Sequence, residues 1–213
     1  MGNSKKMLSE LSVKEFLSVT AGNDPVPGGG SVSALCGSLG AALGQMVANL
    51  TIGRKKYADV EESMKETATL LNSYLNDLTQ DINRDSDAYH AVFSAFQLPK
   101  ETEEDKTIRA QRIEEATKIA AEVPLQVAQK ACKIMDSIQL VATTGNQNAV
   151  TDACVAMMCA RTAVLGALLN VRINLSSIKD AKYVEQLKNE AERLEKEAIE
   201  KETQLLEWIK TIL

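Results

Sequence analysis

Four aspartates and the only histidine of the chain fall in one stretch of fourteen residues, 77–90. Asp87 and His90 are three residues apart, so they share a face if this stretch is helical. Crowded carboxylates raise one another's pKa toward the range useful for acid–base chemistry, and they also stabilise a cationic substrate. The alternative is an ordinary solvated helix face. The pattern therefore marks Asp87 and His90 as candidates for proton transfer.

A second candidate is the glycine-rich stretch that precedes a long uncharged segment. It consists of Pro27, Gly28, Gly29, Gly30 and Ser31. A helix that begins here offers free N–H groups and a favourable dipole to an anion, and glycines let a ligand approach the backbone. The spacing fits neither a Walker A loop nor a dinucleotide-binding fingerprint. The alternative is a loop that only caps the helix.

A basic cluster, Arg54, Lys55 and Lys56, followed by Tyr57, closes the same uncharged segment. Cations of this kind can clamp a carboxylate or phosphate of a ligand, and the tyrosine adds a hydroxyl and a stacking face. The alternative is a solvated helix end whose cations complement the helix dipole.

Asp152 follows the polar loop GNQNAVT at the start of another weakly charged segment. An acid in the first turn of a helix is favourable in itself, so capping is one reading. The other reading is a ligand site in which Asn148 contacts a polar heterocycle.

Composition excludes several classes of function. The four cysteines form no CxxC pair and there is one histidine, so no metal site is expected. A net charge of −5 argues against nucleic acid. The polar N-terminus MGNSKKMLSELSV indicates a cytoplasmic protein with reduced thiols. The uncharged segment 31–53 is long enough to span a membrane, but its Ser, Gln, Asn, Thr and Gly content favours a helix buried on all sides.

The candidates must be positioned by helices, because no segment alternates with period two. Apolar periodicity predicts an all-α bundle of five to seven helices forming one domain, 1–213, around a central uncharged Gly/Ala-rich helix. Helices are expected over 9–20, 30–53, 60–96, 107–141 and 150–171 and from Asp180 onward. Pro124 is expected to kink or break the fourth of these. The last helix keeps a heptad-like apolar seam.

Six blocks in order carry a family resemblance: PGGGSVSAL, GAALGQMVANLTIGRKKY, DSDAYHAV, AAEVPLQVA, GNQNAVTDACVA and GALLNVRINL. Together they resemble the folate cyclodeaminase/cyclohydrolase family. The resemblance implies a helical subunit that forms a homodimer, with a tetrahydrofolate derivative as substrate and no permanently bound cofactor. It implies ring closure of formimino-tetrahydrofolate to the methenyl form with release of ammonia. The alternatives are methenyl-tetrahydrofolate cyclohydrolase and a non-enzymatic dimeric scaffold that binds a partner helix through the heptads.

Roles follow from the resemblance as hypotheses. Asp87 is the first choice and Asp152 the second for stabilising the methenyl cation and moving protons. The candidates for the general acid are Asp87, His90, Tyr57 and Lys56. The glutamate tail, whether single or polyglutamylated, is expected at Arg54, Lys55 and Lys56, and the glycine-rich stretch is expected to cradle a polar or anionic part of the ligand. The pterin reader is expected among Asn49, Asn148 and Asp152.

The proposed ligand residues lie at both ends of one helix. A helix of about 23 residues is roughly 35 Å long. Its two ends cannot touch one pterin, so they are expected to serve either a long polyglutamate tail or two sites in a dimer.

Overall fold

The computed structural model describes residues 6–212. It contains six α-helices and three short 3-10 helices, and no strand occurs within that range, which confirms the all-α prediction. Residues 1–5, part of the polar N-terminus behind the cytoplasmic prediction, lie outside the described residues, as does Leu213. The elements are η1 (Leu8–Glu10), α1 (Val13–Thr20), α2 (Gly29–Thr51), η2 (Lys55–Val60), α3 (Glu61–Phe96), α4 (Glu103–Thr144), η3 (Gln147–Ala149), α5 (Val150–Leu175) and α6 (Ala181–Ile209).

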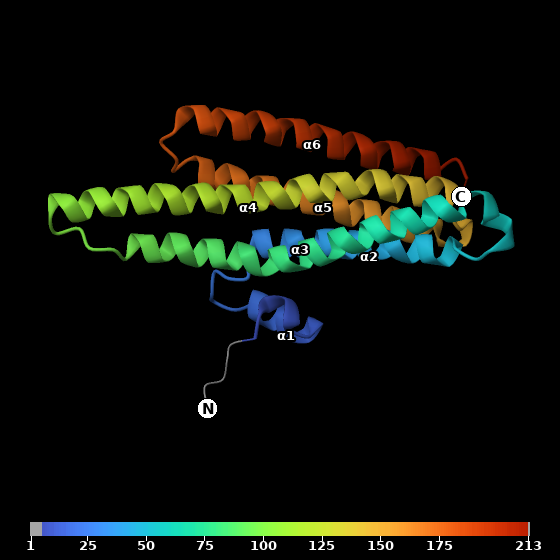
Figure 1. Ribbon diagram of the computed structural model, residues 1–213, viewed down its shortest axis with the longest axis horizontal. Helices are drawn as coiled ribbons and strands as arrows, with labels where there is room; N and C mark the ends of the chain where they lie inside the picture. The colour runs from blue at the N-terminus through green and yellow to red at the C-terminus, as the bar shows by residue number, and fades with distance from the viewer. Residues whose placement is uncertain (1–5, 213) are drawn as a thin grey trace.

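Helices α2, α3, α4 and α5 form an up-and-down bundle, in which each packs against the next and α5 packs back against α2. Helix α6 packs alongside α4 and α5, and α1 lies on the other side of the bundle (Figure 1). Helices α3 and α4 continue beyond the start of α2 and form a projecting arm (Figure 1). A small apolar cluster of Ala88, Ala120 and Val123 joins α3 to α4.

Small residues let α2 approach α5 closely. A Cβ at Gly40 would lie 3.0 Å from the carbonyl oxygen of Ala156 and 3.3 Å from the backbone nitrogen of Ala160. A glycine inside a helix costs about 1 kcal/mol relative to alanine. Here the glycine permits backbone-to-backbone contact, which alanine would prevent.

Helices α2 and α5 are not buried on all sides, contrary to the prediction for the uncharged segment. Each turns an apolar face outward, and Leu39 on α2 and Leu169 on α5 expose 50% and 64% of their area. Both helices are long and apolar enough for a membrane span, and 56% and 50% of their most apolar windows are buried. On α2, composition could not separate the inward face from the outward one because neither face carries a charge.

The predicted start of α4 was wrong, and of the two outcomes expected at Pro124, a kink or a break, the break does not occur. The helix starts at Glu103, before the expected start at 107, because Thr102 and Asp105 form a capping box. Pro124 lies inside α4 and does not break it. Its side chain is buried in the bundle, so packing offsets the missing backbone hydrogen bond.

Helix boundaries elsewhere follow the prediction within a few residues. Asp180 caps α6 through the N–H of Tyr183, as expected. The N-terminus of α5 has no side-chain cap hydrogen bond, and Asp152 lies in its first turn. The apolar seam of α6, including Leu187, Leu194 and Leu205, packs into the chain's own core. The seam is therefore already occupied within the subunit.

Candidate active site

The first turn of α2 is in contact with a carboxylate of the same chain, that of Asp85 on α3. A Cβ on Gly30 would lie 1.9 Å from Asp85 Oδ1 and 2.5 Å from its Cγ, so only glycine leaves room for the carboxylate. The anion that the glycine-rich stretch was expected to attract is here a side chain of α3. The sequence offered the glycines as a site for an anionic part of a ligand and did not identify this partner within the chain.

Ser31 fixes the carboxylate from the helix side. Its Oγ lies 2.9 Å from Asp85 Oδ2 and 3.0 Å from the carbonyl oxygen of Ile82, and it can donate to either. Burial raises the pKa of Asp85, while the hydroxyl and the backbone N–H of Ser31 lower the pKa in part. Asp85 is thus a partly buried carboxyl whose charged form depends on neutral donors.

Asp81, one turn earlier on α3, lies in the opposite environment. Its side chain is 1% exposed and accepts from Lys130 at 2.6 Å and from Arg84 at 2.7 Å. Within residues 6–212 no cation forms an ion pair with Asp85. Two carboxylates one turn apart therefore have different tasks: Asp81 ties α3 to α4, and Asp85 remains without a cation.

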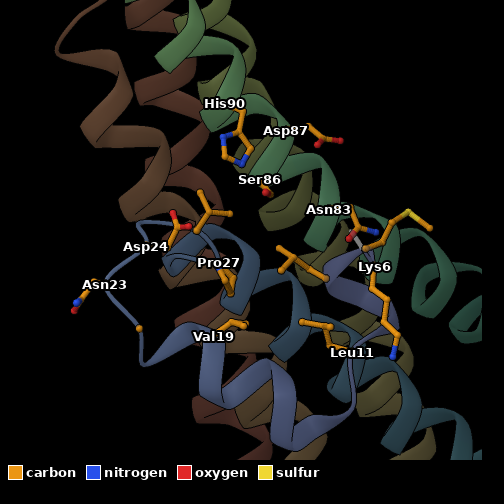
Figure 2. A pocket seen from close by; sticks show the side chains of 14 residues that line it. Lys6, Leu11, Val19, Asn23, Asp24, Pro27, Asn83, Ser86, Asp87 and His90 are labelled. Atoms are coloured by element: carbon orange, nitrogen blue, oxygen red, sulfur yellow. The ribbon is translucent and has the colours of Figure 1, made fainter. Parts of the chain in front are cut away.

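A cavity of about 640 Å³ lies between the N-terminal segment and α3. That volume is in the range of ordinary small-molecule sites. Figure 2 shows the loop before α2 and helix α1 forming one wall and α3 the other. Most of its lining surface is apolar. The polar side chains on α3 are Asn83, Ser86, Asp87 and His90, and the opposite wall contributes Pro27 and the polar side chains Lys6, Asn23 and Asp24.

Asp87 and His90 both line this cavity, as their spacing predicts, but both are exposed. The Asp87 carboxylate points away from the His90 ring (Figure 2). The imidazole packs edge-on against Tyr89, with ring centroids 5.9 Å apart. Asp85 does not belong to the cavity lining, although its neighbour Ser86 does. Asp87 and His90 therefore lie on the face of α3 that lines the cavity, whereas the constrained carboxylate, Asp85, is two residues earlier.

The N-terminal segment is held over α3 by a reciprocal pair of hydrogen bonds. The Ser9 N–H donates to Asn83 Oδ1 at 3.2 Å, and Asn83 Nδ2 donates to Ser9 Oγ at 2.7 Å. Phe16 of α1 is buried in the main core. These contacts fix the wall opposite Asp87 and His90.

The remaining predicted residues gather at the other end of α2. The Tyr57 hydroxyl accepts from the Gln147 N–H at 3.1 Å, and the Thr51 hydroxyl accepts from the Asn146 N–H at 2.8 Å. Asn146 Nδ2 also donates to the carbonyl oxygen of Leu50. The polar loop between α4 and α5 is thereby tied to the end of α2.

Around this junction the candidate side chains are available to a ligand. Arg54, Lys55, Lys56, Asn49 and Asn148 are exposed, and Asp152 is half-buried in the first turn of α5. In the part of the chain that the structure describes, none of the three cations forms an ion pair, and Lys56 lies over the Tyr57 ring at 5.3 Å. Within one subunit the predicted ligand residues thus form two groups, one at each end of α2.

Within residues 6–212 there is no candidate metal site, because no group of three His, Cys, Asp or Glu side chains could hold a metal ion. The four cysteines are free thiols, and burial raises the pKa of each. For Cys132 the pKa rises to about 12. Such thiols are poor nucleophiles.

Comparison with known proteins shows which family this chain resembles. The sequence model of the formiminotransferase-cyclodeaminase family matches residues 12–193. A methenyltetrahydrofolate cyclohydrolase from Methylorubrum extorquens is 38% identical, over 96% of this chain and 99% of its own length. A formimidoyltransferase-cyclodeaminase from Gallus gallus is 32% identical over 92% of this chain, which spans 36% of that protein.

A solved structure extends the comparison to the fold. The crystal structure of formiminotetrahydrofolate cyclodeaminase from Thermotoga maritima superposes with a TM-score of 0.87 and is 28% identical. The match covers 96% of this chain and 98% of that one. The chain therefore belongs to the formiminotransferase-cyclodeaminase family.

Proposed function

We propose that this chain is a folate one-carbon enzyme acting at the methenyl bridge of tetrahydrofolate, with Asp85 as its principal carboxylate. The observation that carries the proposal is the environment of the Asp85 carboxylate. Gly30 leaves room for it, the Ser31 hydroxyl donates to it, and no cation among the described residues neutralises it. The methenyl bridge is a delocalised cation between two folate nitrogens. An ionised carboxylate without a cation of its own is suited to stabilise that charge.

The same carboxylate can move the proton that the chemistry requires. When water attacks the methenyl carbon, its oxygen bonds to that carbon and one proton must leave. Asp85 accepts this proton as a general base and then gives it to the folate nitrogen that leaves the tetrahedral carbon. The remaining hydroxyl proton passes to solvent as the formyl C=O forms, so one proton is released overall. Burial raises the pKa of Asp85, so both protonation states are more accessible near neutral pH than for an exposed aspartate.

Two reactions pass through such a carbon, and the relatives support both. Methenyl-tetrahydrofolate cyclohydrolase is the first candidate, because the relative of that name matches over 99% of its own length at 38% identity. Formimino-tetrahydrofolate cyclodeamination, the reaction preferred from the sequence, is the second candidate. The solved structure of that name shares the whole fold at 28% identity.

A homodimer would bring the two groups of ligand residues into one site. Seven large apolar side chains on the outward faces of α2 and α5 each expose between 37% and 71% of their area: Leu39, Met46, Leu50, Val155, Met158, Leu169 and Ile173. Together they form an apolar patch on the order of 500 Å², a size typical of interaction surfaces. A twofold axis across α2 would place the basic end of one copy beside the Asp85 end of its partner.

The test supplies methenyl-tetrahydrofolate and formimino-tetrahydrofolate in parallel to the purified chain. Decay of methenyl absorbance above the uncatalysed rate supports the cyclohydrolase, and ammonia release from the formimino substrate supports the cyclodeaminase. Absence of both activities in a protein that is folded would refute the proposal.

Three asparagine variants locate the carboxylate. Asp85→Asn is expected to lower turnover at least about a hundredfold, within the range of a positioned acid or base. Asp77→Asn, an exposed position on the same helix, serves as the matched control and should retain full turnover. Asp87→Asn tests the alternative carboxylate, because spacing in the sequence favours Asp87 whereas the geometry of the structure favours Asp85. A larger loss at Asp87 than at Asp85 would reject the assignment of Asp85.

A further inference from the structure

A second polar side chain, Asn170 of α5, contacts the first turn of α2 beside Asp85. A Cβ on Gly29 would lie 3.2 Å from Asn170 Nδ2 and 3.7 Å from its Oδ1, so the amide rests against this glycine as Asp85 rests against Gly30. The two adjacent glycines thus bring side chains from α5 and α3 to neighbouring positions. Consecutive Cα atoms are about 3.8 Å apart, which keeps the amide and the carboxylate within about 12 Å of each other.

The hydrogen bonds of Asn170 leave part of its amide unused. Among the described residues its side chain makes one bond, from Nδ2 to the carbonyl oxygen of Gly166 at 2.9 Å. One amide hydrogen and the Oδ1 acceptor remain. Asn174, one turn later, differs, because its Nδ2 donates both to Ala120 O at 2.8 Å and to Asn170 O at 2.9 Å. Asn174 therefore ties α5 to α4, whereas Asn170 has no such structural task.

Asn170 is a polar side chain surrounded by exposed apolar side chains. It is half-buried, and its neighbours Leu169 and Ile173 are 64% and 71% exposed. Ligand sites commonly combine an apolar wall with a few polar groups that fix orientation. An asparagine within a helix is also less favourable than alanine by several tenths of a kcal/mol, so helix stability does not explain its presence.

We propose that Asn170 binds the pterin ring of the substrate, with Oδ1 accepting from a ring N–H and the unused amide hydrogen donating to the ring carbonyl. This inference rests on the proposed function. The lactam edge of a pterin presents one donor and one acceptor side by side, and a planar amide matches that pair in both directions. With the ring held at Asn170, the fused one-carbon bridge extends along the first turn of α2 toward Asp85.

The test measures binding and turnover of Asn170→Ala against wild type. Loss of one or two neutral hydrogen bonds should weaken binding of tetrahydrofolate about tenfold and raise KM by a similar factor, while kcat changes by less than about threefold. Binding of p-aminobenzoylglutamate, a probe without the pterin, should not change. Unchanged tetrahydrofolate affinity in Asn170→Ala, or an equal loss of both ligands, overturns the inference.

Two further variants separate contact from folding. Asn174→Ala is the matched control, and it should lower Tm while leaving KM unchanged; a rise in its KM equal to that of Asn170→Ala would overturn the inference. Asn170→Asp adds a negative charge near Asp85, so it should move the acidic limb of kcat/KM to higher pH. Wild-type protein without activity on either folate refutes the proposed function itself, whereas active wild type with a neutral Asn170→Ala refutes only this inference.

Discussion

Gly30→Ala is the sharpest perturbation of the site. The added methyl would lie 1.9 Å from Asp85 Oδ1, whereas nonbonded atoms settle at about 3.5 Å. The carboxylate must therefore withdraw by more than about 1 Å from the first turn of α2. A misplacement of that size can cost about a hundredfold in turnover, or about 2.7 kcal/mol of transition-state stabilisation. We expect kcat of Gly30→Ala to fall by about this factor.

A double-mutant cycle with Asp85→Ala tests the cause. If the methyl acts only by displacing the carboxylate, the double variant should be no slower than Asp85→Ala alone. Gly44→Ala is the steric control, since its Cβ would lie 3.1 Å from both Ile138 and Leu71, far along α2. It should lower Tm and leave the turnover of folded protein unchanged.

Two outcomes would refute the reasoning. Wild-type kcat in Gly30→Ala would show that the position of Asp85 does not matter to the reaction. Additive losses in the cycle would show that Gly30 acts independently of Asp85, for example by admitting the ligand to the backbone.

Four other perturbations test separate parts of the structure. Ser31→Ala removes a donor that lowers the pKa of Asp85, so the acidic limb of kcat/KM should move to higher pH. The folded pKa of Asp85 is raised, so its contribution to stability is present at low pH and lost as pH rises through that value; Asp85→Asn should therefore raise Tm at neutral pH. Leu39→Glu places a charge on the outward face of α2 and should weaken self-association at least about a hundredfold in sedimentation, with helicity retained. Asp81→Asn leaves Lys130 without its buried partner and should cost about 3 kcal/mol in urea unfolding.

The architecture was readable from the sequence because helix signals are local. Apolar periodicity placed all six helices, and Asp180 marked the start of α6 through its capping chemistry. The failures were also local. The capping box of Thr102 and Asp105 lies in a run of charges that hides it, and Pro124 is tolerated through packing that no local pattern records.

The candidate site could be predicted from the sequence only in part, because the contact between Gly30 and Asp85 joins two segments that are far apart in the chain. Gly30 and Asp85 are 55 positions apart, and no pattern in either segment predicts that the two residues are in contact. Spacing alone favoured Asp87 and His90 because they share a helix face, and they do line one cavity. The steric demand at Gly30 distinguishes Asp85, and a steric demand requires the fold.

The glycine-rich start of α2 has a different meaning once its neighbours are known. A helix N-terminus with no charge attracts anions, and here Asp85 already supplies one. An anionic part of the ligand would be repelled there, whereas a cation would be attracted. The uncommitted cations of Arg54, Lys55 and Lys56 are at the opposite end of the helix. The cationic bridge of the substrate complements the Asp85 end of α2, and its carboxylate tail complements the basic end, but these ends are roughly 35 Å apart. An antiparallel pair of α2 helices, one from each subunit, would bring the two ends together, which favours such a pair over a site confined to one subunit.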